Sequence, residues 1–279
     1  MKQKVKVLSV LLAAFILAAG IFSCSAPAEE ERDKSSAEDT SENAGKDSAA
    51  EKEPLTIVCL GDSITAGVFE LMPCDTYFNG YVYDVEAAYP ALLEALVEER
   101  GYDVTLINSG ISGNTVTDAL RRLERDVIAH SPDIVTVCFG LNDAGYGDTT
   151  RYTDGLAEIF DTIRANNPDV KIVFLTPNML ADRVNEKTKG SQVNYSMALG
   201  NVHMTESGML DVYMDAARAI CAEKDVPVSD AYAHWKKLYE EGQDISELLA
   251  SNVVHPTREM HPLFAGLILE TLIENDYVK

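Results

Sequence analysis

The sequence predicts an α/β fold, in which about five parallel strands form a sheet with helices on both faces. Short runs of β-branched and other apolar residues recur along the chain. Each run is apolar almost throughout, which is typical of strands that are buried on both faces. Between the runs lie segments whose apolar residues repeat with the period of a helix. Strands and helices that alternate in this way form parallel sheets.

The elements are expected in the following order. The strands are expected at residues 55–60, 104–107, 134–139, 171–175 and 226–228. The helices are expected at residues 89–100, 115–129, 152–165, 204–223 and 262–274. In the first helix, for example, Leu92, Leu93, Leu96 and Val97 share one face. In such sheets the ligand site lies at the carboxyl ends of the strands, so the residues that follow each strand are the candidates for chemistry.

Composition and charge exclude several classes of protein. The chain has 279 residues, 46% of them hydrophobic, which is enough to bury a core. Its formal net charge is −22. This charge repels phosphate backbones, so we expect no nucleic-acid partner. The cysteines form no Cys-x-x-Cys pair and no cluster with histidine, so we expect no metal site.

The N-terminus has the pattern of an export signal. Lys2, Lys4 and Lys6 precede an apolar run over residues 7–22, shorter than the roughly 20 residues that span a bilayer. The run ends in Ile-Phe-Ser-Cys at 21–24, which resembles the lipobox of bacterial lipoproteins. We expect a signal peptide at 1–23 and a lipid on Cys24 that anchors the exported protein to the outer face of the cell membrane. The alternative is an uncleaved anchor or an ordinary signal, and in either case the chain is exported.

Two segments are expected after the signal. Residues 24–53 are acidic and small, with no aromatic residue and no aliphatic residue larger than alanine after Cys24. Such a segment cannot bury enough apolar surface to fold, so we expect a disordered tether. Residues 54–279 contain all the expected strands and helices and are expected to form one domain.

Four residues that can carry chemistry follow expected strands or precede the last helix. Ser63 follows the first strand, Gly113 the second and Asn142 the third, and His255 lies in the C-terminal loop. Each has a simpler explanation on its own, as a helix cap, a turn residue or a structural histidine. Together they make up a nucleophile, two oxyanion donors and a general base.

These motifs resemble the conserved blocks of the SGNH hydrolases, also called the GDSL esterase/lipase family. The matching segments are Gly-Asp-Ser-Ile-Thr at 61–65, Ile-Ser-Gly-Asn-Thr at 111–115, Gly-Leu-Asn-Asp at 140–143 and His-Pro at 255–256. The resemblance implies a flavodoxin-like three-layer sandwich and a serine esterase that needs no cofactor. It implies that Ser63 is the nucleophile, His255 the base, and Gly113 and Asn142 oxyanion donors together with the Ser63 N–H.

One position departs from the family pattern. Asn252 stands where the family usually has an aspartate, three residues before the catalytic histidine. Three explanations compete: a Ser63–His255 dyad oriented by Asn252 or a backbone carbonyl, another acid such as Glu247 or Glu259, or loss of activity. We favour the dyad, because the other blocks are intact. His261 also precedes a proline and is a second candidate for the base, but its position suits the start of the last helix.

The substrate is predicted from two loops that follow strands. Residues 66–89 carry six aromatic side chains, which are Phe69, Tyr77, Phe78, Tyr81, Tyr83 and Tyr89. Residues 177–203 could form a second wall. Tyrosines suit stacking on sugars as well as lining an acyl groove, or they only anchor the loop. Because no large apolar lid is visible in the sequence, we expect hydrolysis of a small acyl ester, acetyl above all, on a carbohydrate. The alternatives are a lysophospholipase-like lipid-ester hydrolase and a non-catalytic module that binds a glycan.

Overall fold

The computed structural model describes residues 54–71 and 80–279. The predicted signal peptide at 1–23, the lipid attachment at Cys24 and the tether at 24–53 lie outside the described residues. Tyr77 and Phe78 lie outside them as well.

The core of the protein is a five-stranded parallel sheet. Its strands run in the order β4 (Val104–Gly110), β1 (Leu55–Gly61), β5 (Ile134–Cys138), β6 (Lys171–Leu175) and β7 (Val228–Ser229). The expectation of about five parallel strands is therefore confirmed. The chain order reverses at β1, because β4 pairs on one side of it and β5 on the other. Ligand sites form at the carboxyl ends of strands beside such a reversal.

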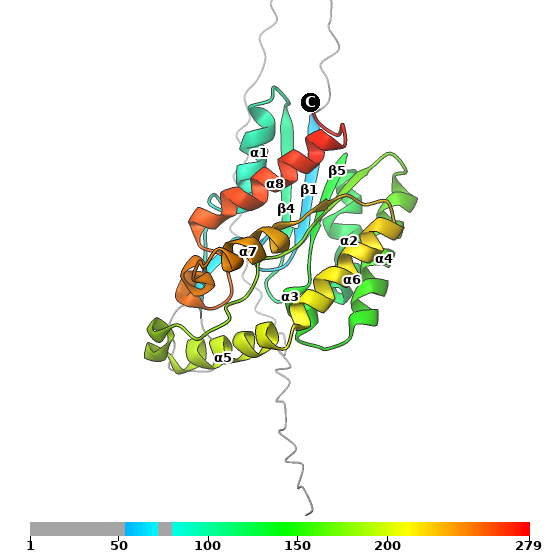
Figure 1. Cartoon of the computed structure of the whole chain (residues 1–279). Helices are drawn as coiled ribbons and strands as arrows, with labels where there is room; N and C mark the ends of the chain where they lie inside the picture. The colour runs from blue at the N-terminus through cyan, green and yellow to red at the C-terminus, as the bar shows by residue number, and fades with distance from the viewer. Residues whose placement is uncertain (1–53, 72–79) are drawn as a thin grey trace, which may run out of the picture. The chain divides into compact units, whose positions relative to one another are not determined.

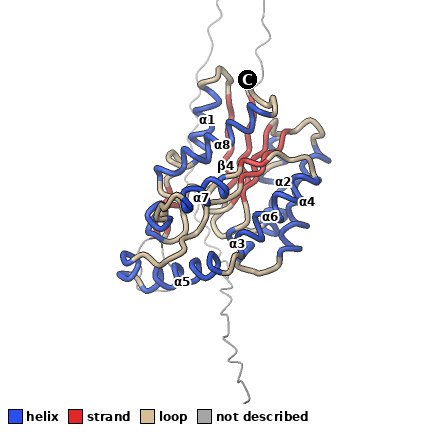
Figure 2. The backbone as a smooth tube through the Cα atoms, viewed as in Figure 1, coloured by secondary structure: helices blue, strands red, loops and turns tan. Residues whose placement is uncertain are grey.

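Helices cover both faces of the sheet (Figure 1). On one face α1 (Tyr89–Glu98) packs against α8 (His261–Glu274), with α7 (Ala231–Glu240) beside it. On the other face α4 (Thr149–Asn166) packs between α2 (Val116–Asp126) and α6 (Met209–Glu223). The strands lie between the two groups of helices, as Figure 2 shows. The predicted three-layer arrangement is confirmed.

Two expected elements differ in the structure. The strand expected at 226–228 is formed by Val228–Ser229, because Val226 lies in the turn that closes α6 and donates its N–H to the carbonyl of Cys221. The helix expected at 204–223 is two helices, α5 (Gln192–Glu206) and α6. They separate at Gly208, whose φ of 69° lies in the left-handed region that ends a helix.

A small antiparallel hairpin follows the first strand of the sheet. It consists of β2 (Val68–Leu71) and β3 (Tyr81–Tyr83), neither of which the sequence pattern indicated. The N–H of Leu71 donates to the hydroxyl of Ser251 at 3.0 Å. The hairpin is therefore attached to the segment that precedes the last helix, far away in the sequence.

Among the helices of residues 54–71 and 80–279, none combines the length and apolarity needed to cross a membrane.

We predict that Gly110→Ala destabilises the domain by about 2 kcal/mol or more, because overpacking a rigid site forces the backbone to move. A Cβ at Gly110 would lie 2.2 Å from the backbone nitrogen of Ala66. Gly266→Ala in α8 is the matched control, since a Cβ there meets nothing within 4 Å. Denaturant unfolding of both variants should show the loss for Gly110→Ala only, and equal stability of the two would contradict the close approach.

Candidate active site

Ser63 lies in a tight turn directly after β1. The turn is closed by the N–H of Ala66, which donates to the carbonyl of Asp62 at 2.9 Å. Gly61 allows this geometry, since a Cβ there would lie 1.9 Å from the hydroxyl of Thr65. Asp62 is buried and accepts the N–H of Ile64 through its side chain at 3.0 Å. The turn therefore places Ser63, which is only 9% exposed, at the carboxyl end of the central strand.

His255 lies between the hydroxyl of Ser63 and a backbone carbonyl. Its Nε2 is 3.0 Å from Ser63 Oγ, and its Nδ1 is 3.1 Å from the carbonyl oxygen of Phe69. A carbonyl can only accept, so the proton of the neutral ring belongs on Nδ1. Nε2 is then free to accept the proton of the Ser63 hydroxyl. Burial lowers the pKa of His255 to about 4, although the bond to Phe69 opposes the shift.

Asn252 does not orient His255. Its side-chain amide donates to the carbonyl of Ser246 at 2.8 Å, and its φ is 55°. Glu247 pairs with Lys187 and accepts from the amide of Asn185. Within the described residues, no carboxylate is hydrogen-bonded to the imidazole of His255. Of the three explanations for the missing aspartate, this geometry matches a dyad oriented by a backbone carbonyl.

His261 lies in the core and not at the nucleophile. It begins α8, and its Nδ1 accepts the N–H of Tyr89 at 3.0 Å. Its ring lies 4.6 Å from the ring of Phe69. Burial lowers its pKa to about 3. The geometry therefore favours His255 over His261 as the partner of Ser63.

The expected oxyanion donors come from three strand ends. The backbone N–H groups of Ser63 and Gly113 donate to no acceptor within the described part of the chain. The amide of Asn142 donates to the carbonyl of Asn114 at 3.0 Å and to the carboxyl of Asp62 at 3.2 Å. To serve an oxyanion, the amide of Asn142 has to give up one of these two acceptors, and the longer bond is the one to Asp62. The burial of Asp62 raises the pKa of its carboxyl to about 7, which weakens it as a hydrogen-bond acceptor near neutral pH.

Arg122, which the sequence motifs did not indicate, connects the carboxyl ends of β1 and β4. It is 7% exposed, and its guanidinium donates to the carbonyls of Gly61 and Ser109 and to the side chain of Asn114. It thereby connects the turn after β1 to the loop after β4. The signal in the sequence was a charged residue between Ala119 and Leu123, on the buried face of α2.

The aromatic residues of the first loop divide into core and surface. Phe69 and Tyr89 are fully buried, and the hydroxyl of Tyr89 is hydrogen-bonded to that of Thr65. Tyr81 and Tyr83 are exposed by 44% and 54%. The ring of Tyr81 lies edge-on to His255 with 6.3 Å between ring centroids. Among the described aromatic residues of the loop at 66–89, Tyr81 and Tyr83 are therefore the candidates for a wall of the site.

The second expected wall contains α5 and a short 3₁₀ helix, Glu186–Gly190. The side chain of Asn201 in α5 donates to the carbonyl of Val253 at 3.0 Å, two residues before His255. The loop is therefore attached to the segment that carries His255.

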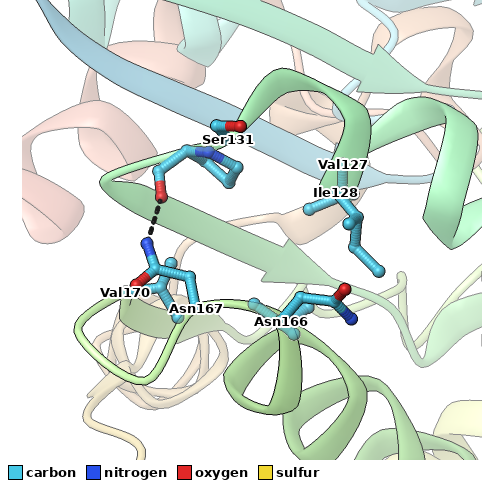
Figure 3. A pocket seen from close by; sticks show the side chains of 8 residues that line it. Val127, Ile128, Ser131, Asn166, Asn167 and Val170 are labelled. Atoms are coloured by element: carbon cyan, nitrogen blue, oxygen red, sulfur yellow. Dashed lines mark hydrogen bonds between the residues drawn. The ribbon is translucent and has the colours of Figure 1, made fainter.

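A cavity of about 380 Å³ lies elsewhere, at the amino ends of the strands (Figure 3). Ser131, Pro132, Asn167 and Val170 line it, and the last of these directly precedes β6. Ser63 follows the carboxyl end of β1, so this cavity is at the opposite edge of the sheet.

Comparisons with known proteins place the chain in one family. Residues 59–263 match the family described as "GDSL-like Lipase/Acylhydrolase family". The arylesterase of Vibrio mimicus is 32% identical over 124 residues, which are 44% of this chain and 56% of that protein. The acetylxylan esterase of Geobacillus stearothermophilus is 47% identical over 65 residues, 23% of this chain and 27% of that protein. These matches thus span about half of the first relative and about a quarter of the second.

Solved structures show the same fold. The lipase/acylhydrolase from Enterococcus faecalis superimposes with a TM-score of 0.55 at 21% identity. The superposition covers 79% of this chain and 96% of that one.

We predict that His255 remains neutral until about pH 4, well below the ordinary histidine pKa of about 6.5, because burial disfavours the charged ring. NMR titration of ¹⁵N-histidine-labelled protein checks this. The same titration of Ser63→Ala shows whether the Ser63 hydroxyl contributes to the low pKa of His255. A midpoint near 6.5 for His255 would contradict the buried geometry.

Proposed function

The chain belongs to the GDSL-like lipase/acylhydrolase family, and we propose that it is a serine esterase that hydrolyses small acyl esters, chiefly acetyl esters of carbohydrates. The observation that carries the proposal is the contact of Ser63 Oγ with His255 Nε2 at 3.0 Å. The N–H groups of Ser63 and Gly113, which have no acceptor among the described residues, lie at the same ends of the strands. This set provides a nucleophile, a base and donors for an oxyanion.

In the first half of the reaction, Ser63 Oγ attacks the acyl carbon while its proton passes to His255 Nε2. The carbonyl oxygen of the ester becomes an oxyanion that accepts from the N–H groups of Ser63 and Gly113 and from the amide of Asn142. The bond between the acyl carbon and the alcohol oxygen then breaks, and the proton on Nε2 passes to the leaving alcohol. In the second half, water attacks the acyl carbon and loses a proton to Nε2. The bond to Ser63 Oγ then breaks, the proton returns from Nε2 to Oγ, and the acyl group leaves as a carboxylic acid.

The carbonyl of Phe69 takes the orienting role that a carboxylate has in a triad. It holds the ring by Nδ1 and fixes the tautomer that leaves Nε2 unprotonated. It carries a dipole and not a charge, so it stabilises the imidazolium less than a carboxylate does. His255 is therefore a weak base that is already neutral in mildly acidic conditions.

Three observations support a carbohydrate ester as substrate. Tyr81 lies against His255 and, with Tyr83, exposes an aromatic surface that suits a sugar ring. The net charge of −22 disfavours polyanionic substrates. One similar protein is named an acetylxylan esterase. A lipid ester remains the alternative, and a non-catalytic glycan-binding module is the rival from another class.

The place of action is a further part of the proposal. The apolar run at 7–22 and Cys24 support export and attachment to the outer face of the membrane through a lipid.

We predict that Ser63→Ala lowers the hydrolysis of p-nitrophenyl acetate by at least about 10³-fold without changing the melting temperature, because the nucleophile is lost and the fold is not. The matched control is Ser207→Ala, whose hydroxyl donates to the carbonyl of Met204 near the end of α5 and has no other hydrogen bond among the described residues. Turnover by Ser63→Ala at the wild-type rate would remove Ser63 from the mechanism. Absence of turnover in the wild type, with acetylated xylan oligomers also tested, would favour the binding module.

We predict that Asn252 contributes little to turnover. Replacing the aspartate of a triad by asparagine costs about 10⁴-fold, whereas losing Asn252 should cost less than about 10-fold, because its amide bonds Ser246 and not His255. Asn252→Gly is a better test than Asn252→Ala, because glycine adopts the positive φ of this position without strain and alanine does not. His255→Ala should cost orders of magnitude in the same assay. If the Asn252 and His255 variants lose turnover equally, Asn252 acts as the third member of a catalytic triad with Ser63 and His255.

A further inference from the structure

The carbonyl that orients His255 lies in an irregular part of the β2–β3 hairpin. Val68 pairs with Tyr83 and Leu71 with Tyr81, and the register shifts between these two pairs. Phe69 falls within that shift, where the pairing of the strands is irregular, and its carbonyl is 3.1 Å from Nδ1 of His255. A two-stranded hairpin is only marginally stable by itself. The position of the Phe69 carbonyl therefore depends on contacts from outside the hairpin.

Arg258 supplies such contacts from the segment that carries His255. It lies three residues after the base, and its guanidinium binds both oxygens of Glu70, the residue next to Phe69. Its Nε donates to the carboxylate of Asp84 at 2.7 Å. Asp84 follows β3, and its N–H donates to the carbonyl of Gly67. One side chain thus connects the His255 segment to both ends of the hairpin.

The guanidinium also covers the ring of Phe69. Its central carbon lies 4.3 Å from the ring centroid, and the imidazole of His261 lies 4.6 Å from the same centroid. Phe69 is fully buried between its neighbours. Arg258 therefore restrains the residue whose carbonyl accepts the hydrogen bond from Nδ1 of His255, both through the adjacent carboxylate and through the ring itself.

We propose that Arg258 is a positioning residue for the catalytic base: by bridging Glu70 and Asp84 and covering Phe69, it holds the Phe69 carbonyl against Nδ1 of His255. This proposal rests on the proposed function. In this proposal the ion pairs of Arg258 fix the orientation of His255, which an aspartate does in most members of the family. The charged groups do not contact the imidazole, because the acceptor at Nδ1 is the Phe69 carbonyl.

The competing explanation is an ordinary surface ion pair. Arg258 and its two partners are about one-third exposed, and isolated pairs of that kind add little to stability. The chain contains a matched example in Arg218, whose side chain is 31% exposed and pairs with Asp215 and Asp230. Arg218 lies on α6 and has no contact with the hairpin or with His255 among the described residues.

The experiment compares Arg258→Met with Arg218→Met, because methionine keeps an aliphatic stem and removes the guanidinium. The first readout is kcat and KM for p-nitrophenyl acetate. The second is the Nδ1–H resonance of His255 in ¹⁵N-histidine-labelled protein, which reports the bond to Phe69 without turnover. Glu70→Gln/Asp84→Asn removes the partners while keeping Arg258, and Arg258→Lys keeps a charge without the planar fork.

We expect Arg258→Met to lower kcat by about 10- to 100-fold with KM changed less than about twofold, since a small misplacement of a catalytic group has effects of that size. The Nδ1–H resonance should be lost or broadened. The Glu70→Gln/Asp84→Asn variant should show the same loss of kcat and of the resonance as Arg258→Met. Combining these substitutions with Arg258→Met should lower kcat little further. Arg258→Lys should recover part of kcat, and Arg218→Met should change neither readout.

The proposal is overturned if Arg258→Met keeps kcat within twofold and retains the resonance, whatever happens to its melting temperature. If Arg258→Met does not fold, the lysine and double-carboxylate variants decide by the same two criteria. If the wild type shows no turnover, the proposed function fails, and the resonance alone still tests whether Arg258 holds the imidazole.

Discussion

The hydrogen bond from Nδ1 of His255 to the carbonyl of Phe69 joins the two ends of the domain at the site. Phe69 lies just after the first strand, and His255 lies shortly before the last helix, 186 residues later. The bond sets the tautomer and the direction of the imidazole, so that Nε2 reaches Ser63. The contacts of Ser251 and Arg258 with the hairpin hold the same two segments together. The geometry of the site depends on this junction.

The burial that makes this junction rigid also governs its charges. Desolvation lowers the pKa of His255 and raises the pKa of Asp62, the residue before Ser63, to about 7. A site that disfavours the charged forms of both groups favours fixed dipoles over ions. Backbone N–H groups and a backbone carbonyl are such dipoles, and they need no reorganisation when charge develops on the substrate. The neutral acceptor at Phe69 is consistent with that environment.

The sheet topology determines which loops can meet. β4 and β5 flank β1, so the residues after these three strands converge on one edge. Arg122 binds the carbonyls at the ends of β1 and β4, and Asn142 after β5 reaches both Asp62 and Asn114. Each link is a hydrogen bond with a defined direction, donated by the guanidinium of Arg122 or by the amide of Asn142, so the loops have little freedom relative to one another. The fold therefore fixes where the proposed oxyanion donors lie, although the amide of Asn142 is already bonded to Asp62 and Asn114.

The sequence by itself determined the parallel sheet and the order of the motifs at its strand ends, because apolar runs and the residues that follow them are local patterns. The positions of Ser63, Gly113 and Asn142 after strands and of His255 before the last helix could be predicted on that basis, whereas their catalytic roles are implied by the family resemblance. Only the tertiary structure decided which group faces Nδ1 of His255, since a backbone carbonyl is the same at every residue and carries no sequence signature. It also separated His255 from His261, because both precede a proline and only packing distinguishes them. The break at Gly208 and the contacts of Arg258 depend in the same way on partners far away in the chain.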